Sequence, residues 1–330
     1  MGIPYRQHPV RRGAPAAKQW TRFLLLALVA LVWSGCTRPP GAVIIFGSPD
    51  SPRMRQAIAG IQSQLDASPV EVVLVPEFGP QGKETLRRLR QAKPRLLIVL
   101  GTPALLLTAP VEKKIPVVFG LVGNPYFTGA AYEPNRPDIH QENITGIASP
   151  APLEAALQHG VSLLGRGAWG LLYDPSDGVA ADLARRFERD AAGVGIRPLT
   201  ETSTTAGDDG PGLERLLARG ARVIFLAPAA STARFAPLVL EWGRNMKVRV
   251  VSGDPAGSHH GAVLWVVLDY HRLGAEIGEL ARRVLAGESP KSIPIAADTP
   301  IRVEVDEALA RKWSAYPPVP SGAHADQGGR

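Results

Sequence analysis

The chain has 330 residues, of which 45% are apolar, and its one cysteine is Cys36. A single cysteine excludes an intrachain disulfide and a cysteine-rich metal site, so an ordinary hydrophobic core must stabilise the fold. Five of the 37 basic residues and none of the 30 acidic ones precede residue 36, which leaves 32 basic residues in the rest of the chain. This near-neutral body lacks the overall basic excess of a nucleic-acid-binding protein, and we expect no nucleic acid partner.

The first 36 residues have the pattern of a secretory signal. Basic residues up to Arg22 precede an apolar run, Phe23 to Trp33, and Ser34-Gly35-Cys36 follows. The run is about half the roughly 20 residues of a membrane-spanning helix. Small residues before a lone cysteine resemble a bacterial lipobox, so we predict a lipoprotein signal peptide over 1–35, a palmitate-type lipid on Cys36 and a spacer over 36–40. The alternative is an uncleaved membrane anchor.

From residue 42 onward, continuous apolar runs alternate with segments of helical spacing. The runs typical of buried strands are Ala42–Phe46, Val70–Val75, Leu96–Leu100, Val117–Phe119, Gly170–Tyr173, Val223–Leu226, Val248–Val251 and Val263–Val267. Apolar residues recur with a helical period in Arg53–Leu65, Lys83–Ala92, Leu153–Leu164, Val179–Ala192, Leu213–Ala218 and Phe235–Met246. This alternation predicts an α/β fold with parallel sheets. Residues 314–330 are rich in Pro, Gly and Ala, and we expect a disordered tail.

Many predicted strands end in turns made of Gly, Pro, Ser, Asp or Asn. Ligands of open α/β sheets bind beyond the carboxyl ends of the strands, where these turns gather. Each turn could equally serve only as a helix cap, since Asp, Ser and Asn accept hydrogen bonds from free N–H groups at a helix start. We favour the capping role for Asp174 and leave both roles open for Asp269.

No pattern in the sequence assembles a catalytic or metal site. The sequence has no phosphate-binding loop, no nucleophile elbow and no H-E-x-x-H motif. The pair His259-His260 lacks an obvious third ligand, and we interpret it as part of a loop. We therefore expect no enzyme, no cofactor and no metal.

A distinctive order of segments runs from Arg95 to Asp306. It comprises Gly101-Thr-Pro-Ala104, Lys114-Ile-Pro-Val-Val-Phe119, Gly123-Asn-Pro125, Glu142-Asn-Ile-Thr-Gly-Ile147, Leu171-Leu-Tyr-Asp-Pro-Ser176, Ile224-Phe-Leu-Ala-Pro228 and a final strand with Val303-Glu-Val-Asp306. This order resembles the ABC-transporter substrate-binding proteins of the tryptophan-binding type, which have the type I periplasmic-binding-protein fold. The resemblance covers nearly all of 41–313.

The resemblance implies two Rossmann-like lobes with parallel sheets, joined by a hinge and closing on a small ligand. Lobe one would comprise 41–146 plus 268–290, and lobe two 147–267 plus 291–313. The ligand contacts that it implies are Ser48, Asp50, Gly101, Thr102, Asn124, Tyr173, Asp174, Ser176, Pro228, Asp254 and Asp269. For a zwitterion such as an amino acid, Ser48 and Thr102 offer donors to the carboxylate, and Asp254 or Asp269 offers an acceptor to the ammonium.

Two functions remain open at this point. The first is a monomeric solute-binding lipoprotein that delivers a small metabolite to an ABC permease. The alternative is a regulatory or structural lipoprotein of the envelope that uses the same bilobed fold to bind a protein partner. Both predict a chain anchored to the bilayer through Cys36 and facing the periplasm or the exterior. In a Gram-negative host, Thr37 after the cysteine favours the outer membrane.

Overall fold

The computed structural model describes residues 41–65, 69–133, 135–253 and 261–314. Residues from Gly41 onward form a compact unit by themselves. The predicted signal peptide, Cys36 and the spacer lie outside the described residues, as does the predicted tail except Ser314. Among the described residues, no helix is both long enough and apolar enough to cross a membrane.

The first sheet has five parallel strands in the order β2-β1-β3-β4-β5. Their bounds are β1 Val43–Gly47, β2 Val70–Leu74, β3 Leu96–Leu100, β4 Val117–Val122 and β5 Ile144–Ala148. Every residue of β1, β3 and β5 is buried, and the continuous apolar sequences of β1 and β3 predict this for strands covered on both faces.

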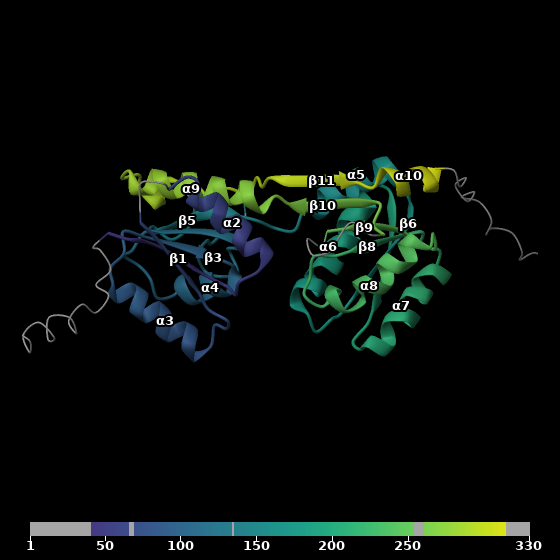
Figure 1. Cartoon of the computed structure of the whole chain (residues 1–330), viewed down its shortest axis with the longest axis horizontal. Coiled ribbons are helices and arrows are strands. Elements are labelled where there is room, and N and C mark those ends of the chain that lie inside the picture. Colours follow the sequence, from purple (N-terminus) through teal and green to yellow (C-terminus); the bar gives the residue numbers. More distant parts are fainter. Residues whose placement is uncertain (1–40, 66–68, 134, 254–260, 315–330) are drawn as a thin grey trace, which may run out of the picture. The chain divides into compact units, whose positions relative to one another are not determined.

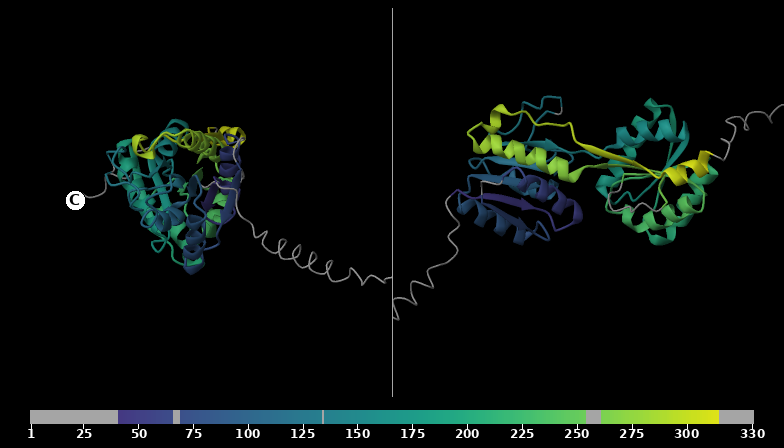
Figure 2. Two further views of the ribbon diagram at one scale, coloured as in Figure 1. Left: turned by 90° about the vertical axis from the view of Figure 1, so that its left-hand side faces the viewer. Right: turned by 45° about the horizontal axis from the view of Figure 1, so that its top comes forward.

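Helices cover both faces of the first sheet (Figures 1 and 2). On one face, α3 (Pro80–Gln91) and α4 (Thr102–Thr108) bury leucines against Phe46 and Phe119. On the other face, α2 (Pro52–Gln62) and α9 (Tyr270–Leu285) pack against alternate residues of the same strands. Helix α9 therefore joins this sheet although its sequence follows the whole of the second sheet's parallel part.

The second sheet has six strands in the order β11-β10-β9-β8-β6-β7. Their bounds are β6 Gly167–Tyr173, β7 Ile196–Thr202, β8 Val223–Leu226, β9 Arg249–Ser252, β10 Leu264–Leu268 and β11 Ile301–Val305. Strands β6 to β10 are parallel, and β11 pairs antiparallel with β10 at one edge.

The second sheet also has a helical layer on each face. Helices α5 (Leu153–Leu164), α6 (Gly178–Gly193) and α10 (Glu307–Ser314) share a core with Trp169 and Phe225. Helices α7 (Ala206–Ala218) and α8 (Thr232–Arg244) form the other core. The predicted α/β class with two largely parallel sheets is confirmed.

The structure differs from the sequence interpretation in three places. Strands β5 and β7 had no predicted counterpart, and α7 begins at Ala206 instead of residue 213. The sequence interpretation also assigned 291–313 to lobe two, whereas Ile293 and Ile295 are buried in the cores of the first sheet. The segment after the short helix η1 (Pro290–Ser292) therefore packs on the first sheet before the chain enters β11.

Candidate functional site

Three of the residues predicted to bind ligand lie just beyond neighbouring strands of the first sheet. Ser48 follows β1, Gly101 follows β3, and Asn124 lies two residues beyond β4. The Ser48 N–H donates to the carbonyl of Leu100 at 3.3 Å, and the Gly101 N–H donates to the carbonyl of Gly120 at 2.9 Å. These two bonds link the ends of β1, β3 and β4. The three turns therefore lie at one edge of the sheet, because the strands are parallel.

The turn at Gly101 sets the position of two predicted ligand residues. Gly101 has φ +97° and ψ 146°, a conformation that is essentially restricted to glycine. The half-buried hydroxyl of Ser48 lies against its backbone, and Thr102 begins α4 immediately afterwards. The sequence motif Gly-Thr-Pro thus holds a serine and a threonine hydroxyl near the strand end.

Asp50 and Asn124 serve local roles. The Asp50 carboxylate forms an ion pair with Arg55 at 2.6 Å, and both side chains are more than half exposed. Ser51, not Asp50, caps α2. The Asn124 Oδ1 accepts hydrogen bonds from the N–H groups of Tyr126 and Phe127 at 3.1 and 3.2 Å.

Asp174 is the most constrained of the predicted residues. It follows β6 and is 9% exposed. Its Oδ1 accepts from the Ser176 hydroxyl at 2.6 Å and from the Ser176 N–H at 2.9 Å. These hydrogen bonds hold the pKa of Asp174 below its ordinary value. The residue does not cap α6, so the capping role that we favoured for it falls to Asp177.

Asp174 belongs to a cluster of buried polar groups that the sequence analysis did not identify. One terminal nitrogen (Nη2) of Arg234 donates to the carbonyl of Ser203 at 2.7 Å. The same nitrogen lies 3.6 Å from Asp174 Oδ2 and 3.4 Å from Asp209 Oδ1. The Ser203 hydroxyl donates to Asp209, whose carboxylate is buried. We call Asp174, Ser203, Asp209 and Arg234 the acid–arginine cluster.

A further carboxylate, that of Asp177, lies in the loop after β6 at the carboxyl edge of the second sheet. Asp177 caps α6 and also accepts from the N–H of Ser231 at 2.9 Å, which ties the loop after β6 to the start of α8. Burial opposes ionisation of Asp177, but the N–H groups of Ser231 and Ala180 outweigh it, so its pKa is lowered. The carboxyl edge of the second sheet thus carries excess negative charge.

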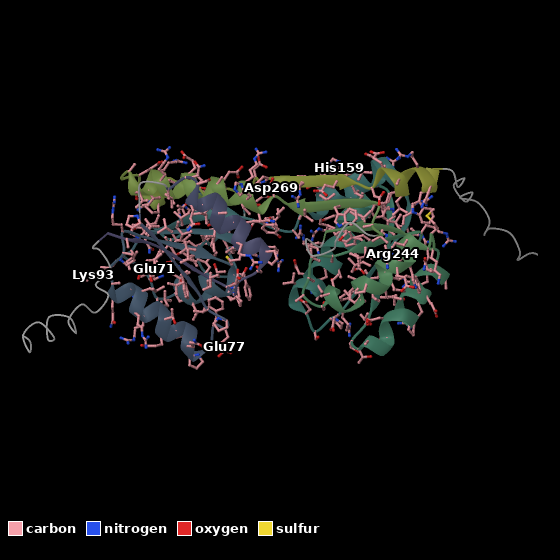
Figure 3. The ribbon with its side chains drawn as sticks, viewed as in Figure 1. Glu71, Glu77, Lys93, His159, Arg244 and Asp269 are labelled. Carbon is pink, nitrogen blue, oxygen red and sulfur yellow. The ribbon has the colours of Figure 1, made fainter. Side chains whose placement is uncertain are left out.

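Of the remaining predicted residues, Tyr173, Pro228 and Asp269 are described and Asp254 is not. Tyr173 is half-buried and packs at the edge of the core, and Pro228 is half-buried just beyond β8. Asp269 caps α9 by accepting from the Arg272 N–H at 3.0 Å, and it lies at the start of that helix (Figure 3). Asp254 and His259-His260 lie outside the described residues.

Other parts of the described chain offer little chemistry. No group of three His, Cys, Asp or Glu side chains among the described residues could hold a metal ion. One surface depression of about 330 Å³ is lined by Trp265, Glu304, Val305, Asp306 and Glu307, none of which is a predicted site residue.

Comparison with known proteins identifies the family. Residues 51–312 match the family described as ABC transporter substrate binding protein. The chain belongs to this family. A comparison with curated proteins finds no match.

Several solved structures share the fold of this substrate-binding protein. A ligand-free, open substrate-binding protein with adhesive properties from Clostridium difficile is 18% identical, with a TM-score of 0.72 over 84% of this chain and 96% of that one. An ABC domain in complex with L-Trp from Streptococcus pneumoniae is 18% identical, with a TM-score of 0.63 over 82% and 94%. A conserved domain protein from Vibrio cholerae is 18% identical, with a TM-score of 0.65 over 84% and 95%.

These findings confirm the type I periplasmic-binding-protein fold for this substrate-binding protein. They leave the individual ligand contacts as predictions. Asp209 and Arg234 escaped the sequence analysis because they lie in the first turns of α7 and α8, both of which begin earlier than predicted, and Ser203 lies just before α7. The sequence Thr205-x-x-Asp208 resembles a helix capping box and would have placed α7 earlier.

Proposed function

We propose that this chain is an extracytoplasmic solute-binding lipoprotein that captures a small zwitterionic metabolite, such as an amino acid, between its two lobes. In this proposal it delivers the metabolite to an ABC permease and carries out no chemistry. The observation that carries the proposal is the acid–arginine cluster at the carboxyl edge of the second sheet, where ligands of open α/β sheets bind.

The charges of the two sheet edges favour a zwitterion. Asp174 and Asp209 place two carboxylates around the single guanidinium of Arg234, which leaves net negative charge to attract an ammonium group. The first sheet presents the hydroxyls of Ser48 and Thr102, which can donate to a carboxylate. The solved relative with L-Trp bound supports a ligand of this class.

Ligand identity is best tested on protein purified under native conditions. Native mass spectrometry should release a bound metabolite, and isothermal titration calorimetry should then give its affinity. Asp174→Asn removes one charge from the cluster, and we expect binding about tenfold weaker. The matched control is Asp190→Asn on α6, whose carboxylate pairs with Arg189 and with no other residue in the described part of the chain. The proposal would be contradicted if the purified protein retained no metabolite and calorimetry detected no binding of amino acids or related zwitterions.

The lipoprotein part of the proposal is tested separately. Metabolic labelling with palmitate should mark the wild-type chain, and a Cys36→Ala variant should lose the label and leave the membrane fraction. Ligand binding should be unchanged in that variant because the described fold begins at Gly41. A Cys36→Ala chain that stays membrane-bound after export would contradict the lipid anchor.

A second candidate function is an envelope protein that binds a protein partner. Phe127 and Tyr132 favour it, because they are 75% and 58% exposed in the segment that follows β4. Crosslinking in the intact envelope should then recover a partner that a Phe127→Ser/Tyr132→Ser variant loses. Intact metabolite binding in that variant would show that the two roles are separate.

A further inference from the structure

The amino-terminal edge of the second sheet carries a cation at the start of each of four neighbouring strands. Arg166 directly precedes β6, Arg197 is the second residue of β7, Arg222 directly precedes β8, and Arg249 begins β9. Lys247 lies two residues before Arg249. We call these five residues the basic row. Adjacent strands lie about 4.8 Å apart, so four neighbouring strands spread the row over roughly 14 Å.

Backbone bonds fix the row at this edge. The strand starts are linked, because the Arg249 N–H donates to the Arg222 carbonyl and the Arg222 N–H to the Ala168 carbonyl, both at 3.0 Å. Ala168 is the register partner of Arg197. The cations therefore keep their order along the edge whatever their side chains contact.

The guanidinium groups are held in place but not saturated. Arg166 Nε donates to the carbonyl of Val194 at 3.3 Å, and Arg197 Nη2 donates to the carbonyl of Arg219 at 3.0 Å. Arg222 Nη1 donates to the carbonyl of Ala221 at 3.0 Å. Each guanidinium has five N–H donors, so most remain available to an external acceptor.

No carboxylate among the described residues forms an ion pair with the basic row. Asp190 pairs with Arg189, and Glu201, toward the other end of β7, is shared by Arg215 and Arg219. Asp306 and Glu307 lie at this edge, because the Asp306 N–H donates to the Val263 carbonyl and the Val263 N–H to the Val250 carbonyl. Glu241 and Arg244, both on the last turn of α8, add one charge of each sign to this end (Figure 3). Cations still outnumber carboxylates along this edge, in a chain whose body is nearly neutral.

Two tryptophans lie against the row at one end, where β9 begins. The Lys247 ammonium lies 5.1 Å from the ring centre of Trp242, and the Arg249 guanidinium lies 4.8 Å from that of Trp313. Both rings are half-buried. Lys247 is exposed and Arg249 is half-buried. A cation beside a partly buried tryptophan is typical of surfaces that contact the interface of a bilayer.

We propose that the basic row binds the phosphate groups of anionic phospholipids at a bilayer surface. Arginine forms paired hydrogen bonds to phosphate, and a row along one edge can contact a planar surface at several points at once. A neutral body with one basic edge would be oriented by this contact. The inference does not depend on Cys36 or on the ligand, since it uses only residues of the second sheet.

The test uses the chain from residue 37 onward, which keeps every described element and lacks the acceptor cysteine. Sedimentation would be compared with vesicles of phosphatidylcholine alone and with 30% phosphatidylglycerol added, a composition chosen at roughly physiological anionic content. We expect binding to the anionic vesicles only, and its loss at high salt because ions screen exposed charges. Arg166→Gln/Arg197→Gln/Arg222→Gln should weaken it about a hundredfold, at roughly fivefold per charge.

The matched control removes three exposed cations from the first sheet's segments, Arg53→Gln/Lys83→Gln/Lys114→Gln, and should bind as wild type does. Circular dichroism would verify that both triple variants are folded. Equal loss in the two variants would overturn the inference, as would equal binding to neutral and anionic vesicles. Binding to soluble heparin with no binding to anionic vesicles would also overturn it and assign the row to a soluble polyanion.

Discussion

The hydroxyl oxygen of Ser48 lies 2.5 Å from the point that a Cβ on Gly101 would occupy. Gly101 also has a backbone conformation that only glycine adopts readily, so two constraints meet where the candidate ligand edge of the first sheet is formed. Alanine at this position must displace either the serine or the turn.

We therefore expect Gly101→Ala to lower the free energy of unfolding by about 2–4 kcal/mol, since backbone strain adds to overpacking. Gly129→Ala is the matched control, because Gly129 has φ +74° but no atom within 4 Å of its would-be Cβ. The control substitution should lower the free energy of unfolding by about 1 kcal/mol, because only the positive φ opposes alanine there. Urea unfolding measures both, and equal losses would show that the contact with Ser48 is unimportant.

Helices α2 and α9 approach each other through glycines. A Cβ on Gly274 would lie 2.1 Å from the carbonyl oxygen of Ala57, and a Cβ on Gly60 would lie 2.1 Å from that of His271. Gly274→Ala should therefore force the helices apart and destabilise the protein by about 1–3 kcal/mol or more. Gly193→Ala at the end of α6, where nothing beyond the chain neighbours lies within 4 Å, should instead stabilise by about 0.5–1 kcal/mol. Thermal unfolding of both variants checks the opposite signs.

Parts of this architecture could be predicted from the sequence because they depend on local patterns. Continuous apolar runs such as Leu96–Leu100 identified the buried strands. Strand β7 escaped because Arg197, Pro198 and Glu201 interrupt its apolar pattern. It is an edge strand with partly exposed residues, so its pairing with β6 sets its structure more than its own composition does.

The candidate site was harder to predict than the fold. The turns after β1, β3 and β6 were found because Gly, Ser and Asp mark strand ends. The acid–arginine cluster was not, since Asp209 and Arg234 belong to first turns of helices that are separated by more than 20 residues. Only the packing of α7 and α8 on one face of the sheet brings their side chains together. A local sequence pattern does not show that two residues so far apart in the chain come into contact.

Glu112 couples the stability of the first lobe to pH. Burial opposes its ionisation, but the N–H groups of Ile115 and Lys114 and the guanidinium of Arg90 outweigh it, so its pKa lies below 4.5 in the folded state. A lowered pKa contributes stability that is present above the unfolded value and is lost as pH falls through the folded value. Wild type should therefore lose stability as the pH falls below about 4.5, the ordinary value of a glutamate.

A substitution pair on α3 isolates this effect. Arg90→Gln removes one donor to Glu112, so the stability difference between pH 7 and pH 3 should shrink. Arg88→Gln, which removes an exposed ion pair with Glu84, should change that difference less because solvent screens the pair. Denaturant unfolding at several pH values measures both. A pH dependence that Arg90→Gln leaves intact would assign the acid sensitivity to other carboxylates.

Neighbouring aspartates at the start of α7 should differ in their effects. Asp209 is 5% exposed and accepts from Ser203 while facing Arg234, so Asp209→Asn removes the charge from a buried network and should cost about 1–3 kcal/mol. Asp208 is half-buried and accepts from the Thr205 N–H at 3.0 Å, a role that asparagine keeps, so Asp208→Asn should cost at most about 0.5 kcal/mol. Urea unfolding gives both values. If the two costs are equal, the Asp209 contact with Arg234 contributes nothing to the fold, and the guanidinium is held by Ser203 and Asp174 alone.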